Sequence, residues 1–282
     1  MTKQEHILIE LAESFPQLAL PISNETRLGE EYKAVVLRGE RLKCKPEFSF
    51  SPFDRLETAA TPAGDVKVLS LHEREDFEHC IRALAHSCEA VELPKTMGAS
   101  TISGLINWEK IRNRQKEYLA DGGDDWDGEF ARFTSDRNNY RDTVIVLSRG
   151  FYSALPSEEA GFDAEKWTEL SYGIRKYHEL AHFVSRRLFP DNKDAVRDEV
   201  LADMNGIIGA LGHFDAELEG KFLGIYNGKY THGRLENYVA PEELEDAVER
   251  VCAMLEYLRE NCTGEQRPFE FLLKLEEGRV FL

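Results

Sequence analysis

The sequence contains no apolar run long enough to cross a membrane, because charged residues interrupt every hydrophobic segment before the roughly 20 residues that a transmembrane helix needs. Its first ten residues are broken by Lys3, Glu5 and Glu10, and no apolar stretch there leads to a small-residue cleavage site. No secretory signal is therefore predicted, and we expect a cytoplasmic protein with no membrane partner.

Cysteine is scarce, and positive charge is outweighed. The five cysteines are an odd number at irregular spacing in a chain of 282 residues, which favours reduced thiols over a disulfide framework. The 35 Lys and Arg residues face 52 Asp and Glu residues, for a formal net charge of −17. Such a chain repels a phosphate backbone, so we expect no nucleic-acid partner.

The clearest chemistry lies at residues 176–183, which read KYHELAHF. His178 and His182 are four residues apart, so on a helix they lie one turn apart on one face and can hold one cation between them. Glu179 then lies beside the cation and does not bind it. Apolar residues at helical spacing predict a helix over residues 164–188, which Pro190 ends.

A second helix is predicted after the turn, capped by Asp191-Asn192, with two carboxylates on its apolar face, Glu199 and Asp203. A carboxylate directed at a core is unfavourable unless it is paired, protonated or bound to a metal.

The distance of each residue from the turn, counted along the chain, predicts which histidine each carboxylate faces. His182 and Glu199 lie equally far from the turn, and so do His178 and Asp203, so an antiparallel hairpin places each pair level. We therefore predict Glu199 as the third metal ligand, and Asp203 as the acceptor that fixes the tautomer of His178.

The whole pattern, HELAH at residues 178–182 followed after sixteen residues by EVLAD, resembles the gluzincin branch of the zinc metallopeptidases, the thermolysin-like group. The resemblance covers about residues 164–211. It implies a zincin-like fold, a Zn²⁺ ion held by His178, His182 and Glu199, Glu179 as general base, and Asp203 as the orienting carboxylate. The implied reaction is hydrolysis of an amide bond in a peptide or protein substrate.

Other interpretations stay open at this point. The His pair could face solvent, with the two carboxylates neutralised by Arg175, Arg186 or Arg197, or zinc could be held without catalysis. The protein could also be a cytoplasmic regulatory zincin selective for one protein partner, or a metallohydrolase of small amides or esters. A pocket closed at both ends would favour small substrates, whereas a peptidase needs an extended groove.

Residues 222–239 follow the predicted hairpin and are rich in polar and aromatic groups. Metallopeptidases of the resembled group polarise the scissile carbonyl with a Tyr or His located beyond the third ligand. His232 and Tyr230 are therefore predicted to stabilise the oxyanion, with His213 behind them. The alternative is an ordinary loop. The segment offers these groups: Tyr226, Asn227, Tyr230, Thr231, His232, Arg234, Asn237 and Tyr238.

Before the hairpin, the pattern predicts strands at residues 32–42, 66–71 and 143–147, and helices at residues 4–15, 74–91 and 105–119. Residues 98–104 are predicted as a turn of small residues. In the resembled fold an edge strand pairs with an extended substrate, and residues 143–147 either take that role or form a buried central strand. The spacing of His79, Cys80, His86 and Cys88 does not support a second metal site.

Together these patterns predict an α+β protein. Residues 1–160 are expected to form a small mixed sheet with several helices, and residues 161–282 a helical part that carries the metal-binding hairpin.

Overall fold

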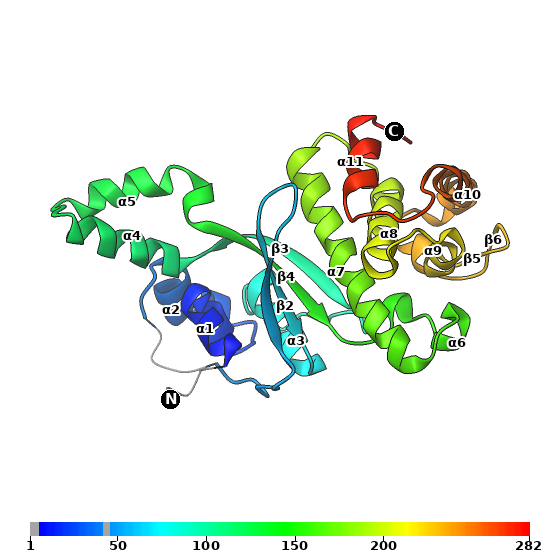
Figure 1. Cartoon of the computed structure of the whole chain (residues 1–282). Coiled ribbons are helices and arrows are strands. Elements are labelled where there is room, and N and C mark those ends of the chain that lie inside the picture. Colours follow the sequence, from blue (N-terminus) through cyan, green and yellow to red (C-terminus); the bar gives the residue numbers. More distant parts are fainter. Residues whose placement is uncertain (1–5, 42–45) are drawn as a thin grey trace. The chain divides into compact units, whose positions relative to one another are not determined.

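The computed structural model describes residues 6–41 and 46–282, which form two compact units (Figure 1). The first unit consists of residues up to Ala59, Val66–Pro94 and Ser100–Ser148, and the second of Ala60–Asp65, Lys95–Ala99 and Arg149–Leu282. Residues 149–160 therefore group with the second unit, although the sequence had suggested a boundary at residue 160. None of the helices in these described ranges has the length and apolar content to span a membrane.

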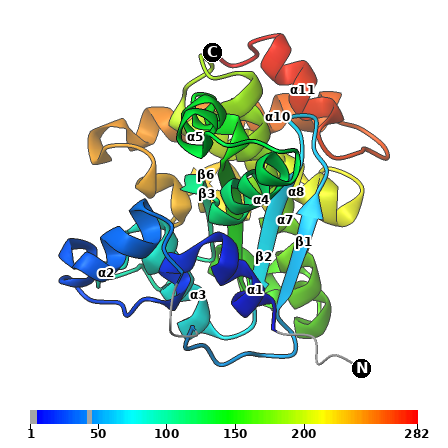
Figure 2. The same cartoon turned by 90° about the vertical axis from the view of Figure 1, so that its left-hand side faces the viewer.

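The first unit is built on a four-stranded mixed sheet with the strand order β1-β2-β4-β3. Figure 2 shows β1 and β2 side by side. Strands β1 (Arg55–Ala59) and β2 (Val66–Leu71) pair antiparallel, with Arg55 opposite Ser70. Strand β2 pairs parallel with β4 (Arg141–Ser148), with Lys67 opposite Val144. Strand β3 (Ala99–Ile106) is the other neighbour of β4. The described residues thus form a mixed α/β protein with a small mixed sheet.

Strand β4 is a central strand, so the prediction that residues 143–147 form a substrate-pairing edge is wrong and the buried alternative is confirmed. Val144, Ile145, Val146 and Leu147 are each 0% exposed. Successive side chains of a strand point to opposite faces, so an unbroken buried run requires cover on both faces.

The helices of the first unit are α1 (Ile7–Ser14), α2 (Glu30–Tyr32), α3 (Arg74–Ala85), α4 (Trp108–Ala120) and α5 (Trp126–Thr134). The predicted strand at residues 32–42 is wrong, because Glu30–Tyr32 and Lys33–Leu37 are helical; Leu42 lies outside the described residues. Val35 and Val36 are buried there. A short apolar run does not distinguish a buried helical turn from a strand.

Further boundaries differ from the prediction. The helix predicted at residues 105–119 is α4 and begins at Trp108, because Leu105 and Ile106 belong to β3. Helix α3 ends at Ala85 rather than at residue 91, and Ser87 and Cys88 then adopt positive φ angles of 54° and 67°. Most of the predicted turn at residues 98–104 belongs to β3. Small residues have low strand propensity, but the hydrogen bonds that β4 offers to its neighbour outweigh that preference.

The second unit is mainly helical. It contains the elements α6 (Ser157–Ala160), α7 (Ala164–Leu188), α8 (Ala195–Leu211), α9 (Ala216–Leu223), β5 (Ile225–Tyr226), β6 (Lys229–Tyr230), α10 (Leu244–Asn261) and α11 (Glu270–Glu277). The short 3-10 helices η5 (Tyr152–Ala154) and η6 (Arg234–Asn237) lie before α7 and after β6. A core that includes Trp167, Ile174, Ile207 and Phe222 joins α7, α8 and α9.

Helix α7 has the predicted bounds, and Asp163 caps it by accepting a hydrogen bond from the Lys166 backbone nitrogen at 2.9 Å. The predicted cap of α8 at Asp191-Asn192 is wrong. Asp194 caps this helix through the Arg197 backbone nitrogen at 2.9 Å, while the Asn192 side chain donates to Glu276. Asp and Asn are both favourable N-cap residues, so the sequence pattern located the turn between α7 and α8 but not the residue that caps α8.

Helices α7 and α8 pack closely because α8 presents glycine to α7. A Cβ at Gly206 would lie 2.7 Å from the Ile174 carbonyl oxygen, and one at Gly209 would lie 2.2 Å from the Tyr177 ring. Asn205 adds a cross-link by donating to the Tyr177 carbonyl oxygen at 2.8 Å. This close approach brings the histidines of α7 within reach of the carboxylates of α8.

Candidate metal centre

Three side chains of the α7–α8 hairpin point their polar atoms at one another. The Nε2 atoms of His178 and His182 are 3.1 Å apart. Glu199 places Oε1 3.3 Å from His182 Nε2 and Oε2 3.6 Å from His178 Nε2. Both histidines are buried, at 5% and 7% exposure. In residues 6–41 and 46–282, this is the group of His, Cys and carboxylate side chains close enough to share one metal ion.

These separations fit a tetrahedral ion. Metal–ligand bonds of about 2.1 Å at tetrahedral angles put neighbouring ligand atoms about 3.4 Å apart. His182 Nε2 lies 3.1 Å from His178 Nε2 and 3.3 Å from Glu199 Oε1, and one ligand atom from each residue lies within 4.8 Å of the others. Two imidazoles and one carboxylate form a donor set that suits zinc and leave one tetrahedral position for another ligand. The chemistry and spacing of the three residues therefore fit Zn²⁺.

Asp203 lies behind His178, on the side away from the cluster. Its Oδ1 is 2.8 Å from His178 Nδ1 and its side chain is 0% exposed. With Nδ1 bonded to a carboxylate, His178 keeps its proton there and presents Nε2 to the cluster. The two level pairs expected from the spacing are present, His182 with Glu199 and His178 with Asp203.

Arg234 supplies a counter-charge to Asp203. Its Nη2 donates to Asp203 Oδ2, and its Nη1 donates to the hydroxyl of Tyr152 at 3.1 Å. The Tyr152 hydroxyl in turn donates to Asp203 Oδ1 at 2.5 Å. The buried carboxylate thus meets a cation and several donors, which satisfies the requirement for an anion in a core.

The charges around the cluster favour ionised carboxylates. Burial opposes ionisation of Glu199, but the hydrogen bond from His182 and the charges of both histidines hold the pKa of Glu199 well below its usual value. Burial also opposes ionisation of Asp203, and Arg234 and His178 outweigh it and lower the pKa of Asp203. For His178, burial is outweighed by Asp203 and Glu199, which raise its pKa.

The three residues predicted to act in catalysis, Glu179, Tyr230 and His232, lie on different elements. Glu179 follows His178 on α7 and is half-buried. Tyr230 lies on β6, where its hydroxyl donates to Glu236 Oε2 at 2.7 Å and accepts from the Gly233 backbone nitrogen at 3.0 Å. His232 is exposed in the following turn. Within the described part of the chain, neither Tyr230 nor His232 bonds to the three clustered residues, and their roles stay predictions.

Tyr238 lies in the same segment, and its phenol interacts electrostatically with Glu199 and Asp203. Burial raises the pKa of this phenol, so it stays protonated at neutral pH. The sequence included Tyr238 and Arg234 among the polar groups of residues 222–239 but gave no spacing rule that would select them. Tyr152, 26 residues before His178, carries no signal of its own in the sequence.

Close backbone contact between Gly224 and Gly233 determines how residues 222–239 fold. A Cβ at Gly224 would lie 2.3 Å from the His232 carbonyl oxygen, and one at Gly233 would lie 2.5 Å from the Gly224 Cα. Only glycines allow the two backbones to approach so closely. The β5–β6 hairpin therefore closes on itself immediately before Arg234, which begins η6.

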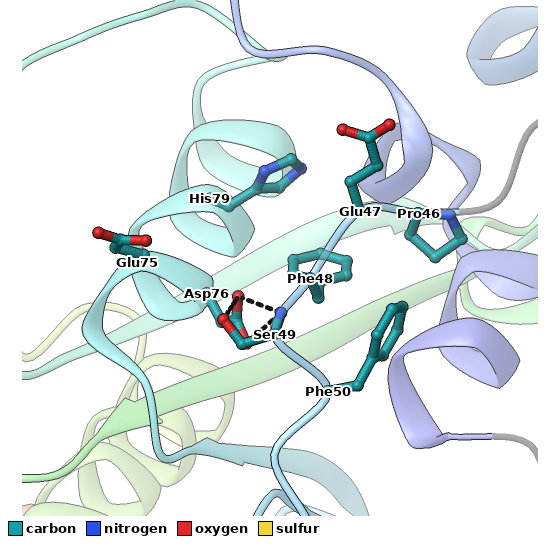
Figure 3. A pocket seen from close by; sticks show the side chains of 8 residues that line it. All are labelled: Pro46, Glu47, Phe48, Ser49, Phe50, Glu75, Asp76 and His79. Atoms are coloured by element: carbon teal, nitrogen blue, oxygen red, sulfur yellow. Dashed lines mark hydrogen bonds between the residues drawn. The ribbon is translucent and has the colours of Figure 1, made fainter.

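An open pocket of about 550 Å³ lies in the first unit (Figure 3). Its walls are residues 46–50 on one side and Glu75, Asp76 and His79 of α3 on the other. Asp76 accepts from the backbone nitrogen of Ser49 at 3.1 Å, and the ring of His79 packs edge-on against Phe48 at 4.7 Å. Burial lowers the pKa of His79. These contacts hold residues 46–50 against α3.

The chain matches a family model over residues 2–269, described as a family of unknown function (DUF7005), and the protein belongs to that family. No curated protein and no solved structure matches the chain.

Proposed function

We propose that this DUF7005 protein is a zinc-dependent hydrolase of peptide or related amide bonds, with a zincin-like arrangement of its metal helices. The observation that carries the proposal is the cluster of His178, His182 and Glu199, whose ligand atoms, one from each residue, lie within 4.8 Å of one another. The order HExxH then ExxxD along the chain supports the gluzincin type among the possible zinc sites.

Each residue then has a defined role. His178, His182 and Glu199 would hold the ion, and Asp203 would orient His178. When bound, zinc supplies a Lewis acid that lowers the pKa of water and polarises a carbonyl group. Glu179 accepts a proton from the attacking water and passes it to the leaving amine. The water oxygen bonds to the carbonyl carbon and the C–N bond breaks, so that the amide and water give an acid and an amine.

Tyr238 is a further candidate to stabilise the oxyanion, beside Tyr230 and His232. Its phenol interacts electrostatically with Glu199, one of the three ligand residues. A phenol held in its protonated form can donate a hydrogen bond to the oxygen that gains charge as the carbonyl is attacked.

The deciding variant is Glu179→Gln, which keeps the shape of the side chain but cannot accept the proton. We expect it to bind Zn²⁺ as the wild type does and to lose about 10²- to 10⁴-fold in turnover of a peptide library. Glu165→Gln, an exposed glutamate at the start of the same helix, is the matched control and should keep full activity. If Glu179→Gln hydrolysed the library as fast as the wild type, Glu179 would not be the general base.

The substrates distinguish the related hypotheses. Cleavage of many peptides in the library supports a general peptidase. Turnover confined to small acyl amides or esters supports a small-molecule hydrolase, and cleavage of a single protein from a defined panel supports a regulatory enzyme.

A further inference from the structure

We propose that Tyr152 is a positioning residue of the metal centre, whose hydroxyl restrains the ring of His178 in its metal-binding orientation. The inference rests on the proposed function only where it concerns zinc. Its geometric part concerns how His178 is held in the protein itself.

Three polar atoms meet behind His178. The Tyr152 hydroxyl oxygen is 2.8 Å from His178 Nδ1 and 2.5 Å from Asp203 Oδ1, and Nδ1 is 2.8 Å from the same carboxylate oxygen. Tyr152 is 4% exposed and Asp203 is 0% exposed, so water does not replace these contacts freely.

Counting protons assigns each contact. With Nε2 of His178 facing the cluster, its proton is on Nδ1. The single hydroxyl proton of Tyr152 goes to Asp203, and the hydroxyl oxygen accepts from Arg234 Nη1 at 3.1 Å. The Nδ1–H of His178 then lies between two acceptors, the carboxylate and the hydroxyl oxygen. Rotation of the ring breaks both contacts, whereas Asp203 alone would supply only one.

The backbone that presents Tyr152 is strained. The next two residues, Ser153 and Ala154, both have positive φ angles, 54° and 55°. Such conformations are unfavourable for residues other than glycine, and they persist where the surroundings fix them. Ser171 of α7 accepts from the Tyr152 backbone nitrogen at 2.9 Å, and Ser153 donates to the Phe222 carbonyl oxygen at 2.9 Å. Both anchors hold the hydroxyl under His178.

Tyr152 also fills the core, because its ring meets Phe222 edge-on at 4.8 Å. The variant Tyr152→Phe separates the two roles, since it keeps the ring and removes only the hydroxyl. Tyr226→Phe is the matched control: it removes a half-buried hydroxyl that donates to Glu159 at 3.0 Å in the same unit.

The first measurement is Zn²⁺ affinity by competition with a chromophoric chelator. Tyr152→Phe is expected to bind about 10- to 100-fold more weakly, the usual loss when a group that orients a ligand is removed. Its Co²⁺ complex should show an altered visible spectrum, which a loss of core packing alone would not produce. Tyr226→Phe should match the wild type in both. Wild-type Zn²⁺ affinity in Tyr152→Phe would overturn the proposal.

A second measurement needs no metal. The Nδ1 proton of His178, assigned by its loss in Asp203→Ala and His178→Gln, should give a downfield proton NMR signal in the metal-free wild type. This signal should shift or broaden in Tyr152→Phe and stay in place in Tyr226→Phe. An unchanged signal in Tyr152→Phe would refute the positioning role. If the wild type binds no zinc, the proposed function fails, and this signal still decides the role of Tyr152.

Discussion

The substitution Gly206→Ala tests whether the spacing of α7 and α8 sets the metal centre. A Cβ at Gly206 would lie 2.7 Å from the Ile174 carbonyl oxygen and 3.4 Å from the His178 Cβ, where 3.4 Å is the start of ordinary contact. The helices must therefore separate locally by about 0.7 Å, which exceeds the roughly 0.2 Å tolerance of metal–ligand distances. We expect Zn²⁺ affinity to fall by about tenfold or more.

The stability of this variant should change only modestly. Alanine gains up to about 1 kcal/mol over glycine inside a helix, and overpacking costs about 1–3 kcal/mol, so the free energy of unfolding should fall by about 0–2 kcal/mol. Urea unfolding and chelator competition measure the two effects. A folded Gly206→Ala protein with wild-type zinc affinity would refute the reasoning.

Three further outcomes follow from the second unit. Tyr238→Phe should lower kcat about 10²- to 10³-fold with zinc still bound, as expected for an oxyanion donor; steady-state kinetics would contradict this if only KM changed. Gly233→Ala should weaken zinc binding, because its Cβ would lie 2.5 Å from the Gly224 Cα and would displace Arg234; calorimetric zinc titration that matches the wild type would exclude this coupling. Glu219 is 0% exposed, and burial, with Asp203 nearby, raises its pKa well above 4.5. Its ionisation therefore opposes folding as pH rises above about 4.5, its unfolded value. Glu219→Gln should be stabilised relative to the wild type in metal-free protein at pH 8 but not at pH 4, and an equal difference at both pH values in denaturant unfolding would contradict the assignment.

The α7–α8 hairpin could be predicted because local rules agree there. Apolar periodicity and Pro190 define α7 without help from distant residues, and the two level pairs of side chains follow from equal spacing about the turn. The start of α8 was less certain, since Asp191, Asn192 and Asp194 are all good caps and tertiary contacts decide among them. Periodicity therefore gave the hairpin, and the cap depended on packing.

The surrounding groups could not be predicted in the same way. A strained turn brings Tyr152 to His178, and Arg234 and Tyr238 follow the close contact between Gly224 and Gly233. The strained turn and the glycine contact both depend on tertiary packing, which no local sequence pattern encodes. The strand β3 is a similar case, because its small residues acquire strand structure only beside β4.

The central claim is that His178, His182 and Glu199 bind one zinc ion. Elemental analysis of protein purified without added metal tests it most directly, with His182→Ala and Glu199→Ala measured beside the wild type. The account predicts about one zinc per wild-type chain and a loss of zinc in both variants. Wild-type protein that contains no metal, even after zinc has been offered and excess removed, would contradict it.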